Sequence, residues 1–370
     1  MAANLRNPFK PTAGMNPPEL IGRDAVLDEF AESLDNGPGA PDRLMRVSGI
    51  RGIGKTVMLN ALGDVAASRG FHVVNVASDA GFCERIAQMV APVASFQTVT
   101  VEPELWGLKA GSIGFEKAVP AFGEILYKAS CKTGLFVTVD EVQDASHDEL
   151  RALGNEIQLL IRRGANVAFA FAGLPFSVDG IVNGKGLTFL QRAKQVTLTR
   201  LKDYQVQDSL EDTVRSSGMA ISPAVAEAIT EAAAGYPFMV QLVGYHTWQT
   251  AARRGSEVIS AADMERGVQT ARKDFDAMVI EPALRRLPDG QIAYLLAMAG
   301  CGEKFASSGE VAQAMGRDTK DVSSFRRRLI DANLIEPLGY GKVGFAIPYL
   351  REYLLSHRDD ILEDIGALSR

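Results

Sequence analysis

Short apolar runs alternate with amphipathic stretches along the first half of the chain. The amphipathic stretches repeat apolar residues at a spacing of about 3.6 positions, which predicts helices that each bury one face. The apolar runs are short and lack that spacing, which predicts buried strands. These runs cover residues 43–48, 71–77, 135–139, 166–172 and 195–201. Because strands that alternate with helices form mostly parallel sheets covered on both faces, the expected fold class is α/β.

The pattern changes after residue 202, where the strands stop. Helical patterns follow at residues 204–217, 223–234, 239–254 and 261–287. They are broken at Gly218, at Gly235-Tyr236-Pro237 and at Gly255. Glycine and proline in such positions end helices, so this part of the chain predicts a separate helical domain.

The last part of the chain has a third pattern. Short helices are expected at residues 288–299, 307–315 and 319–333, followed by a glycine-rich hairpin at 338–345 and a helical stretch at 349–368. We therefore expect domains at residues 1–202, 203–287 and 288–370. Residues 1–20 carry four prolines and should form an arm that lies over a surface. Residues 95–117 include an alternating stretch rich in Gly and Thr, which predicts a hairpin or a mobile insertion.

Composition narrows the class of protein. The chain has 370 residues, of which 46% are apolar and 23% charged, and this is ordinary for a globular protein with more than one domain. Its three cysteines are far apart and have no zinc-ligand spacing. The chain has no secretory h-region and no apolar run of about 18 residues. A cytoplasmic location without a membrane partner is therefore expected, and the net charge of −6 leaves any basic surface local.

A glycine-rich segment, Gly49–Thr56, carries the first chemical signal. It fits the pattern G-x-x-x-x-G-K-S/T and lies between a predicted strand and a predicted helix. In this context the backbone N–H groups surround phosphates, the lysine reaches the β- and γ-phosphates, and the hydroxyl ligates Mg²⁺. A glycine-rich turn that matches by chance is the alternative, and the strand–loop–helix order argues against it. The expected binding residues are Gly49, Gly52, Ile53, Gly54, Lys55 and Thr56.

A second signal follows the apolar run at residues 135–139, which ends in Asp140-Glu141. The carboxyl ends of parallel strands meet at one edge of a sheet, beside the expected phosphate loop. We expect Asp140 to hold the Mg²⁺ shell and Glu141 to orient or deprotonate the attacking water. Gln143 and Asp144 are interpreted as a capped, solvated start of the next helix. Since no Asn-Lys-x-Asp segment is present, ATP and Mg²⁺ are the expected cofactors of a P-loop NTPase.

With these motifs, the chain resembles the AAA+ superfamily and its STAND neighbours, and especially the origin-recognition-like AAA ATPases of archaea and bacteria. Residues 19–24 are similar to the family segment that lines the adenine pocket, which implies roles for Ile21 and Gly22. Gly235-Tyr236-Pro237 is similar to the G-x-P motif of the helical lid, where Pro237 would back the base. Arg192 lies where the family carries an arginine finger. A helix start, a helix break and a solvated arginine are the respective alternatives.

Two positions depart from the family. The sensor 1 position falls at residues 172–175, which contain no Asn, Ser or Thr, and the sensor 2 position has Met239, Val240 and Gln241 in place of arginine. Groups of this kind polarise the γ-phosphate and the water, and each is worth a few kcal/mol. The resemblance with these departures implies slow hydrolysis by a nucleotide-gated switch.

The C-terminal pattern resembles the winged helix–turn–helix that family members carry after the lid. On its third helix Val322, Phe325, Leu329 and Ala332 should face inward. The residues expected to meet double-stranded DNA are Lys320, Ser324, Arg326 and Arg327, with Arg328 beside them.

Charge leaves the use of this helix open. Residues 280–370 hold 12 Lys and Arg against 13 Asp and Glu, whereas residues 317–328 hold five basic residues against two acidic ones. One interpretation is an ATP-switched DNA-binding protein that self-associates through Arg192. The other is a STAND-type signalling or defence switch whose winged helix contacts a separate protein. A metabolic P-loop enzyme is disfavoured because no substrate-site chemistry accompanies the lid.

Overall fold

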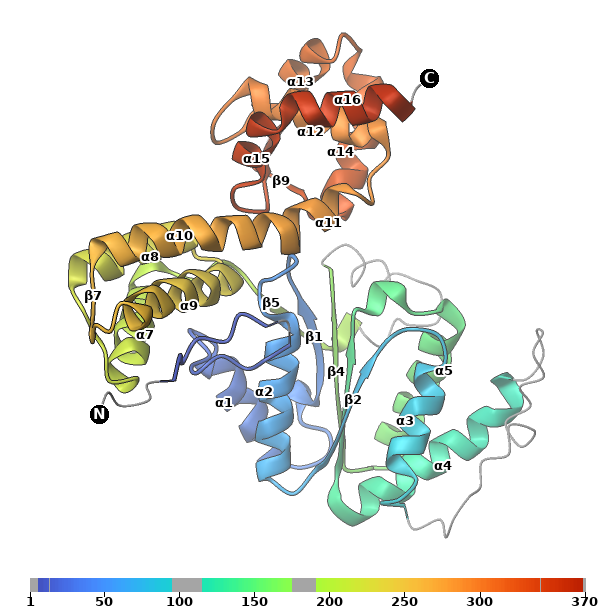
Figure 1. Cartoon of the computed structure of the whole chain (residues 1–370). Helices are drawn as coiled ribbons and strands as arrows, with labels where there is room; N and C mark the ends of the chain where they lie inside the picture. Colours follow the sequence, from blue (N-terminus) through green and yellow to red (C-terminus); the bar gives the residue numbers. More distant parts are fainter. Residues whose placement is uncertain (1–5, 13, 95–114, 175–190, 340, 369–370) are drawn as a thin grey trace. The chain divides into compact units, whose positions relative to one another are not determined.

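A computed structural model describes residues 6–12, 14–94, 115–174, 191–339 and 341–368 (Figure 1). The chain forms two compact units. One unit, the α/β unit, comprises Gly22–Gly49 and Lys55–Leu198. The other, the helical unit, comprises Met1–Ile21, Ile50–Gly54 and Thr199–Arg370. Of the predicted hairpin or insertion at residues 95–117, the part up to residue 114 lies outside the described residues.

The α/β unit contains a parallel sheet of five strands in the order β2-β3-β4-β1-β5. The strands are β1 (Leu44–Ser48), β2 (His72–Ala77), β3 (Leu135–Asp140), β4 (Val167–Gly173) and β5 (Lys194–Thr197). All five lie where the sequence predicts strands, so the α/β fold class is confirmed. β5 is shorter than predicted because its partner strand β1 ends opposite Thr197, at Ser48.

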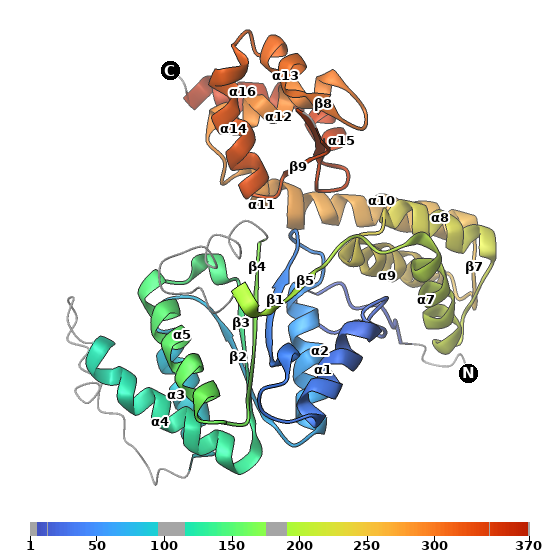
Figure 2. The same cartoon turned by 180° about the vertical axis from the view of Figure 1, so that it is seen from behind.

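Helices cover both faces of this sheet (Figure 2). They are α1 (Asp24–Asp35), α2 (Lys55–Ser68), α3 (Phe82–Val90), α4 (Phe115–Thr133) and α5 (His147–Arg162). Side chains alternate along β3, so that Leu135, Val137 and Val139 face α3, α4 and α5. Phe136 faces the other way and meets Phe30 of α1 with ring centroids 5.0 Å apart.

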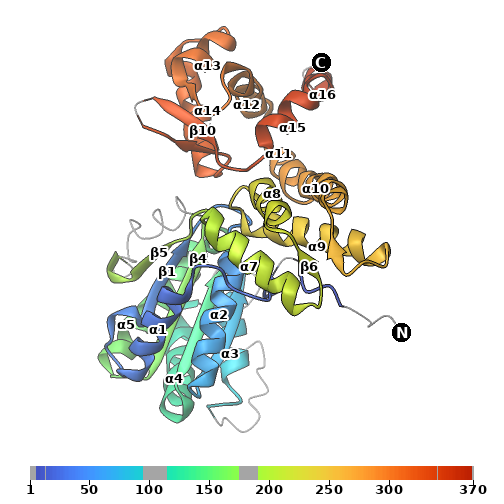
Figure 3. The ribbon, with the colours of Figure 1, turned by 90° about the vertical axis from the view of Figure 1, so that its left-hand side faces the viewer.

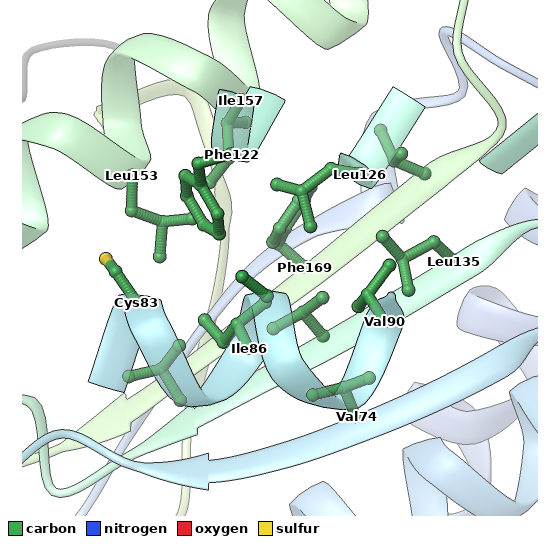
Figure 4. Close-up of a cluster of buried hydrophobic side chains, with 14 of the residues drawn as sticks. Val74, Cys83, Ile86, Val90, Phe122, Leu126, Leu135, Leu153, Ile157 and Phe169 are labelled. Carbon is green, nitrogen blue, oxygen red and sulfur yellow. The ribbon is translucent and has the colours of Figure 1, made fainter. Parts of the chain in front are cut away.

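The main core of the α/β unit lies between the sheet and helices α3, α4 and α5. In Figure 4, Ile86 and Val90 of α3 point towards Phe122 and Leu126 of α4 and towards Phe169 of β4. These five side chains are less than one-tenth exposed. Burial of this kind contributes roughly 1.5–3 kcal/mol for each large apolar side chain and fixes the sheet against its helices.

The first part of the helical unit consists of packed helices, in the region that the sequence predicts as a lid. These are α7 (Asp203–Ser216), α8 (Pro223–Ala233), α9 (Pro237–Arg253) and α10 (Ala261–Phe275). The expectation that strands stop after residue 202 is wrong in one detail, since β6 (Ala220–Ile221) and β7 (Val258–Ile259) pair in parallel. Strands of two residues are too short to leave an alternating pattern in the sequence.

The long helix predicted at residues 261–287 is interrupted. After α10 the chain forms a π-helix, Asp276–Ile280, and then α11 (Glu281–Leu284). In this segment the N–H of Glu281 donates to the carbonyl of Asp276, five residues earlier. Pro282 has no N–H to continue the α-helical pattern, and the helix accommodates it with this wider turn.

The C-terminal part of the helical unit combines helices with a small antiparallel sheet (Figure 3). Its elements are α12 (Asp289–Cys301), β8 (Ala306–Ser307), α13 (Ser308–Ala314), α14 (Thr319–Asp331), β9 (Ile335–Pro337), β10 (Lys342–Phe345), α15 (Leu350–Ser356) and α16 (Arg358–Leu368). The strand order is β8-β10-β9. The predicted hairpin is present, but its first strand precedes residue 338.

The sequence predicts only that the N-terminal arm lies over a surface, and in the structure the arm packs against α9 of the helical unit. Phe9 is 2% exposed and packs on Gly244 of α9, where an added Cβ would come within 2.4 Å of its ring. The side-chain amide of Asn7 donates to the carbonyl of Tyr245 over 2.9 Å.

Among the described helices, none is both long and apolar enough to cross a membrane.

Candidate active site

The glycine-rich segment connects β1 to α2, as expected. Gly52 and Gly54 adopt φ values of 71° and 97°, in the left-handed region that L side chains rarely enter. The N–H of Ile53 donates to the carbonyl of Ile50 over 3.4 Å, and the Ile53 side chain is buried. The first turn of α2 contains no acidic residue, so the positive end of the helix is not neutralised by its own side chains. Such a loop followed by a helix N-terminus suits an anion.

Lys55 is the first residue of α2 and is only 5% exposed. Its Nζ donates to the carbonyl of Gly49 over 3.2 Å, which folds the side chain back along the loop. The ammonium group therefore lies beside the glycine loop at the start of α2, where its positive charge would attract a phosphate.

Thr56 and Asp140 form the contact that joins the two sequence motifs. Thr56 Oγ1 donates to Asp140 Oδ2 over 2.5 Å, and Asp140 is the last residue of β3. Burial raises the pKa of the Asp140 carboxyl, although the bonds from Thr56 and from the N–H of Glu141 act in the opposite direction. A hydroxyl and a partly buried carboxylate are hard oxygen donors, which fit the one or two protein ligands that Mg²⁺ takes beside phosphates. Within the described ranges, no cluster of three or more His, Cys, Asp or Glu could hold a metal by itself.

Glu141 follows in an unusual backbone conformation. Its φ of 53° and ψ of 44° are left-handed, which is uncommon for a residue other than Gly, Asn or Asp. Its N–H donates to Asp140 Oδ1 over 2.9 Å, and the Ser78 hydroxyl donates to its carbonyl. Conformations of this kind cost of order 1–3 kcal/mol, so they persist only where the surrounding structure holds them in place. They are concentrated at functional sites.

Gln143 corrects the sequence interpretation, which placed it in a solvated helix start. It lies in the 3₁₀ turn Val142–Asp144, where its Nε2 donates to Glu141 Oε2 and its Oε1 accepts from the N–H of Leu174 over 3.3 Å. The helix cap belongs instead to Ser146, whose hydroxyl accepts from the N–H of Glu149 over 3.2 Å. The contact between Gln143 and Leu174 spans 31 positions and leaves no local pattern in the sequence.

The lid segment Gly235-Tyr236-Pro237 is placed by its own contacts within the helical unit. Pro237 is the first residue of α9, where a missing N–H has no cost. Tyr236 is fully buried, and an added Cβ at Gly52 would come within 2.6 Å of its hydroxyl oxygen. Ile21 packs against a buried cluster. Its members are Leu201, Val206, Ala233 and Val240.

The remaining predicted positions belong to both units. Arg192 is exposed and lies just before β5 in the α/β unit. Gly22, in the same unit, has a φ of 64°. At the sensor 2 position Met239 is buried, and Gln241 accepts a hydrogen bond from the N–H of Lys10 over 2.9 Å.

On α14 the exposed residues include Lys320, Ser324 and Arg327. Arg326 does not share their exposure. Its Nε is buried without a hydrogen-bond partner among the described residues, and its charge acts on the buried Tyr294 of α12. Successive residues of an α-helix point in different directions, so Arg326 faces the interior of the C-terminal part of the helical unit although the adjacent Arg327 is exposed.

These features define the fold of the P-loop nucleoside triphosphatases, with a parallel α/β sheet, and a helical region follows it in the chain. A family described as an AAA domain matches residues 35–235, more than half of the chain. The chain belongs to this family. A second family, described as a domain of unknown function, matches residues 277–354. Among curated proteins, no sequence matches the chain.

Several solved structures share this fold. The Orc2 protein of Aeropyrum pernix, described in ADPNP-ADP complexes, has a TM-score of 0.67 and 16% identity over 96% of this chain and 98% of its own. The Walker-type ATPase PABY2304 of Pyrococcus abyssi has a TM-score of 0.67 and 14% identity over 92% and 97%. Cdc6 of Pyrobaculum aerophilum has a TM-score of 0.53 and 16% identity over 96% and 98%. These likenesses show that the chain shares its fold with these solved structures.

Proposed function

We propose that this protein binds Mg²⁺·ATP and hydrolyses it slowly, as a nucleotide-gated switch. The observation that carries the proposal is the contact between Thr56 Oγ1 and Asp140 Oδ2, because it brings the phosphate-loop hydroxyl and the acidic strand end together as two oxygen ligands. The Orc2 structure with ADPNP and ADP supports an adenine nucleotide as the ligand.

The proposed roles follow from position. Backbone N–H groups from Gly49 to Gly54 and the start of α2 would hold the phosphates, and Lys55 would neutralise the β- and γ-phosphates. Mg²⁺ held by Thr56 and Asp140 would neutralise charge on the phosphate oxygens. Glu141 would orient the attacking water and take its proton.

We propose that Ile21, Gly22 and Pro237 contact the base. We also propose the domain boundaries that the sequence predicts, at residues 1–202, 203–287 and 288–370. Arg192 would act on the nucleotide of a neighbouring copy, since its exposed side chain is accessible to another chain. Slow turnover follows from the sensor positions, because residues 172–175 lack the polar side chain of the family and residues 239–241 lack its arginine, and such groups stabilise the developing charge.

The switching part of the proposal is supported by contacts within the helical unit. Tyr236, which lies against Gly52, meets Phe275 of α10 with ring centroids 5.5 Å apart. Phe275 in turn meets Tyr349, which precedes α15. The Tyr349 hydroxyl donates to the carbonyl of Ala232 in α8. A conformational change of the glycine loop would thus be transmitted to the C-terminal helices through these packed side chains.

Measurement of phosphate release tests the enzymatic part. Wild-type protein should release phosphate from Mg²⁺·ATP at a rate below about 1 s⁻¹. Glu141→Gln should slow release by about a hundredfold or more and keep nucleotide binding. The control Asp144→Asn changes an exposed carboxylate at the end of the same 3₁₀ turn and should match wild type. A wild-type rate well above this range would contradict the slow switch, and unchanged release by Glu141→Gln would remove the role of Glu141.

We further propose that the C-terminal module is a winged helix that binds double-stranded DNA through α14. The exposed residues Lys320, Ser324 and Arg327 support this, and Arg326 would act only if its half-buried side chain turned outward. Fluorescence anisotropy with a duplex should show binding that weakens with salt. Arg327→Ala should weaken it, whereas Arg358→Ala on α16 should not. Salt-insensitive or unchanged binding would contradict DNA as the partner.

The second candidate is a signalling or defence switch in which this module contacts a separate protein. The observation that favours it is the burial of Arg326 together with the balanced charge of residues 280–370. Absence of duplex binding, together with a purified partner chain that dissociates when ATP is added, would select this candidate.

A further inference from the structure

The side chain of Gln143 links the carboxylate of Glu141 to the end of β4. Its Nε2 donates to Glu141 Oε2, and its Oε1 accepts from the N–H of Leu174 over 3.3 Å. Gln143 is half-buried, and Leu174 is 7% exposed. The amide therefore has a partner at each end and is held on both sides.

The chemistry of the partners fixes which way the amide faces. A backbone N–H can only donate, so the group that meets Leu174 has to be the carbonyl oxygen of Gln143. The NH₂ group then faces Glu141, and a carboxylate is the acceptor that makes this bond strong. The reversed amide would place two donors together at Leu174 and two acceptors together at Glu141.

The fold explains why this residue reaches both partners. β3 and β4 are neighbours in register up to Val139 and Phe171, so their carboxyl ends lie side by side. The left-handed conformation of Glu141 turns the chain sharply after β3, and the 3₁₀ turn brings Gln143 back towards the strand ends. β4 ends in Ala172-Gly173 and Leu174 follows it, and none of these three residues has a polar side chain.

We propose that Gln143 is the positioning residue for Glu141. From the turn after β3, its side chain makes the polar contact that the apolar end of β4 cannot make. The inference rests on the proposed hydrolysis. In that reaction the water oxygen bonds to the γ-phosphorus, the bond from that phosphorus to the β–γ bridging oxygen breaks, and Glu141 takes the water proton, leaving ADP and phosphate. Gln143 holds the carboxylate at the angle this transfer requires and does not itself touch the reacting atoms.

Two substitutions separate positioning from a structural role. Gln143→Glu has the same size and keeps an acceptor for the N–H of Leu174, but it replaces the donor to Glu141 by a like charge. Gln143→Ala removes both contacts. If the residue only ties the turn to β4, Gln143→Glu retains the rate. If it positions Glu141, both variants lose it.

We expect kcat to fall between about tenfold and about a hundredfold in both variants, since a misplaced catalytic group costs on that order. KM for ATP and the dissociation constant of Mg²⁺·ATP should stay within about twofold of wild type, because binding uses other residues. The control Asp144→Asn should leave both constants unchanged. Coincident thermal unfolding with wild type excludes misfolding, and the isosteric Gln143→Glu gives the decisive value if Gln143→Ala is unstable.

A double-mutant cycle completes the test. Against a Glu141→Gln background, Gln143→Ala should have no further effect on single-turnover hydrolysis, since both act through one group. A wild-type rate in Gln143→Glu, or additive losses in the cycle, would overturn the inference while leaving the proposed ATPase intact. Absence of hydrolysis by the wild-type protein would instead remove the proposed function.

Discussion

The hydroxyl of Tyr236 lies so close to Gly52 that a Cβ atom at position 52 would come within 2.6 Å of its oxygen. This relationship joins the glycine loop to the start of the lid inside one compact unit. Gly52 also has a φ of 71°, so both its conformation and its neighbour require a residue without a side chain. The hydroxyl itself is buried and has no hydrogen-bond partner among the described residues.

Gly52→Ala should therefore destabilise the protein and weaken nucleotide binding. A left-handed alanine costs roughly 1–2 kcal/mol, and the clash with the Tyr236 ring adds to this because the ring is buried. Thermal unfolding measures the first effect and ATP titration the second. The control is Gly300→Ala in α12, where an added Cβ meets nothing within 4 Å. Equal unfolding temperatures for the two variants would show that the close approach has no energetic weight.

Tyr236→Phe should stabilise the nucleotide-free protein. It removes a buried hydroxyl that has no partner in the described structure and keeps the aromatic ring against Phe275. An unsatisfied buried polar group costs about 1–3 kcal/mol, so urea unfolding should give a higher free energy of unfolding by a value in that range. Burial also raises the pKa of the Tyr236 phenol, which keeps it neutral at any pH used. A lower free energy of unfolding in the variant would reveal a hydrogen bond that the geometry does not contain.

Asp140→Asn should have opposite effects on stability and on metal-dependent binding. Burial raises the pKa of Asp140 above its unfolded value, so ionisation at neutral pH opposes folding in the absence of a cation. The amide should therefore raise the unfolding temperature of the nucleotide-free protein at pH 7. It should also remove the additional stabilisation of the protein that ATP gives when Mg²⁺ is present. Asp144→Asn is the control, and a variant that keeps the full Mg²⁺ effect would rule out Asp140 as a ligand.

Asp263 should make the free energy of unfolding depend on pH in the opposite direction to Asp140. Burial alone would raise its pKa, but hydrogen bonds from Arg254 and Ser260 outweigh it and lower the pKa to about 2. Its folded pKa is thus below the unfolded value of about 3.9, so its stabilisation is complete above that value and is lost as the pH falls through about 2.

Asp263→Asn should therefore lower the free energy of unfolding by about 2 kcal/mol at pH 7, and the difference from wild type should shrink towards pH 2. Urea unfolding across this pH range measures both. Glu265→Gln, an exposed neighbour on α10, is the control. A difference from wild type that stays constant with pH would assign the loss to packing instead of charge.

The sequence predicted most of the fold because its signals are local. Buried parallel strands leave apolar runs, and helix ends carry glycine or proline, as at Gly235 and Pro237. The phosphate loop was predicted residue by residue because its chemistry resides in consecutive positions. Asp140 was placed at the sheet edge because strand direction determines where strand ends lie.

Features that depend on distant partners could not be predicted in this way. The bond from Leu174 to Gln143 and the burial of Arg326 against α12 depend on tertiary packing. Glutamine after an acidic strand end is ambiguous until the neighbouring strand is known. The π-helix at Asp276–Ile280 was detectable in principle from Pro282, but helical periodicity continues through that stretch and masked it.

Calorimetric titration of Mg²⁺·ATP into the whole chain tests the central claim most directly. We expect saturable binding by the wild-type protein and by the control Lys132→Ala, an exposed lysine at the end of α4. Lys55→Ala should lose this binding, because Lys55 supplies the positive charge of the first turn of α2. Absence of heat with wild-type protein, or unchanged affinity in Lys55→Ala, would contradict the assignment of Gly49–Thr56 as the nucleotide site.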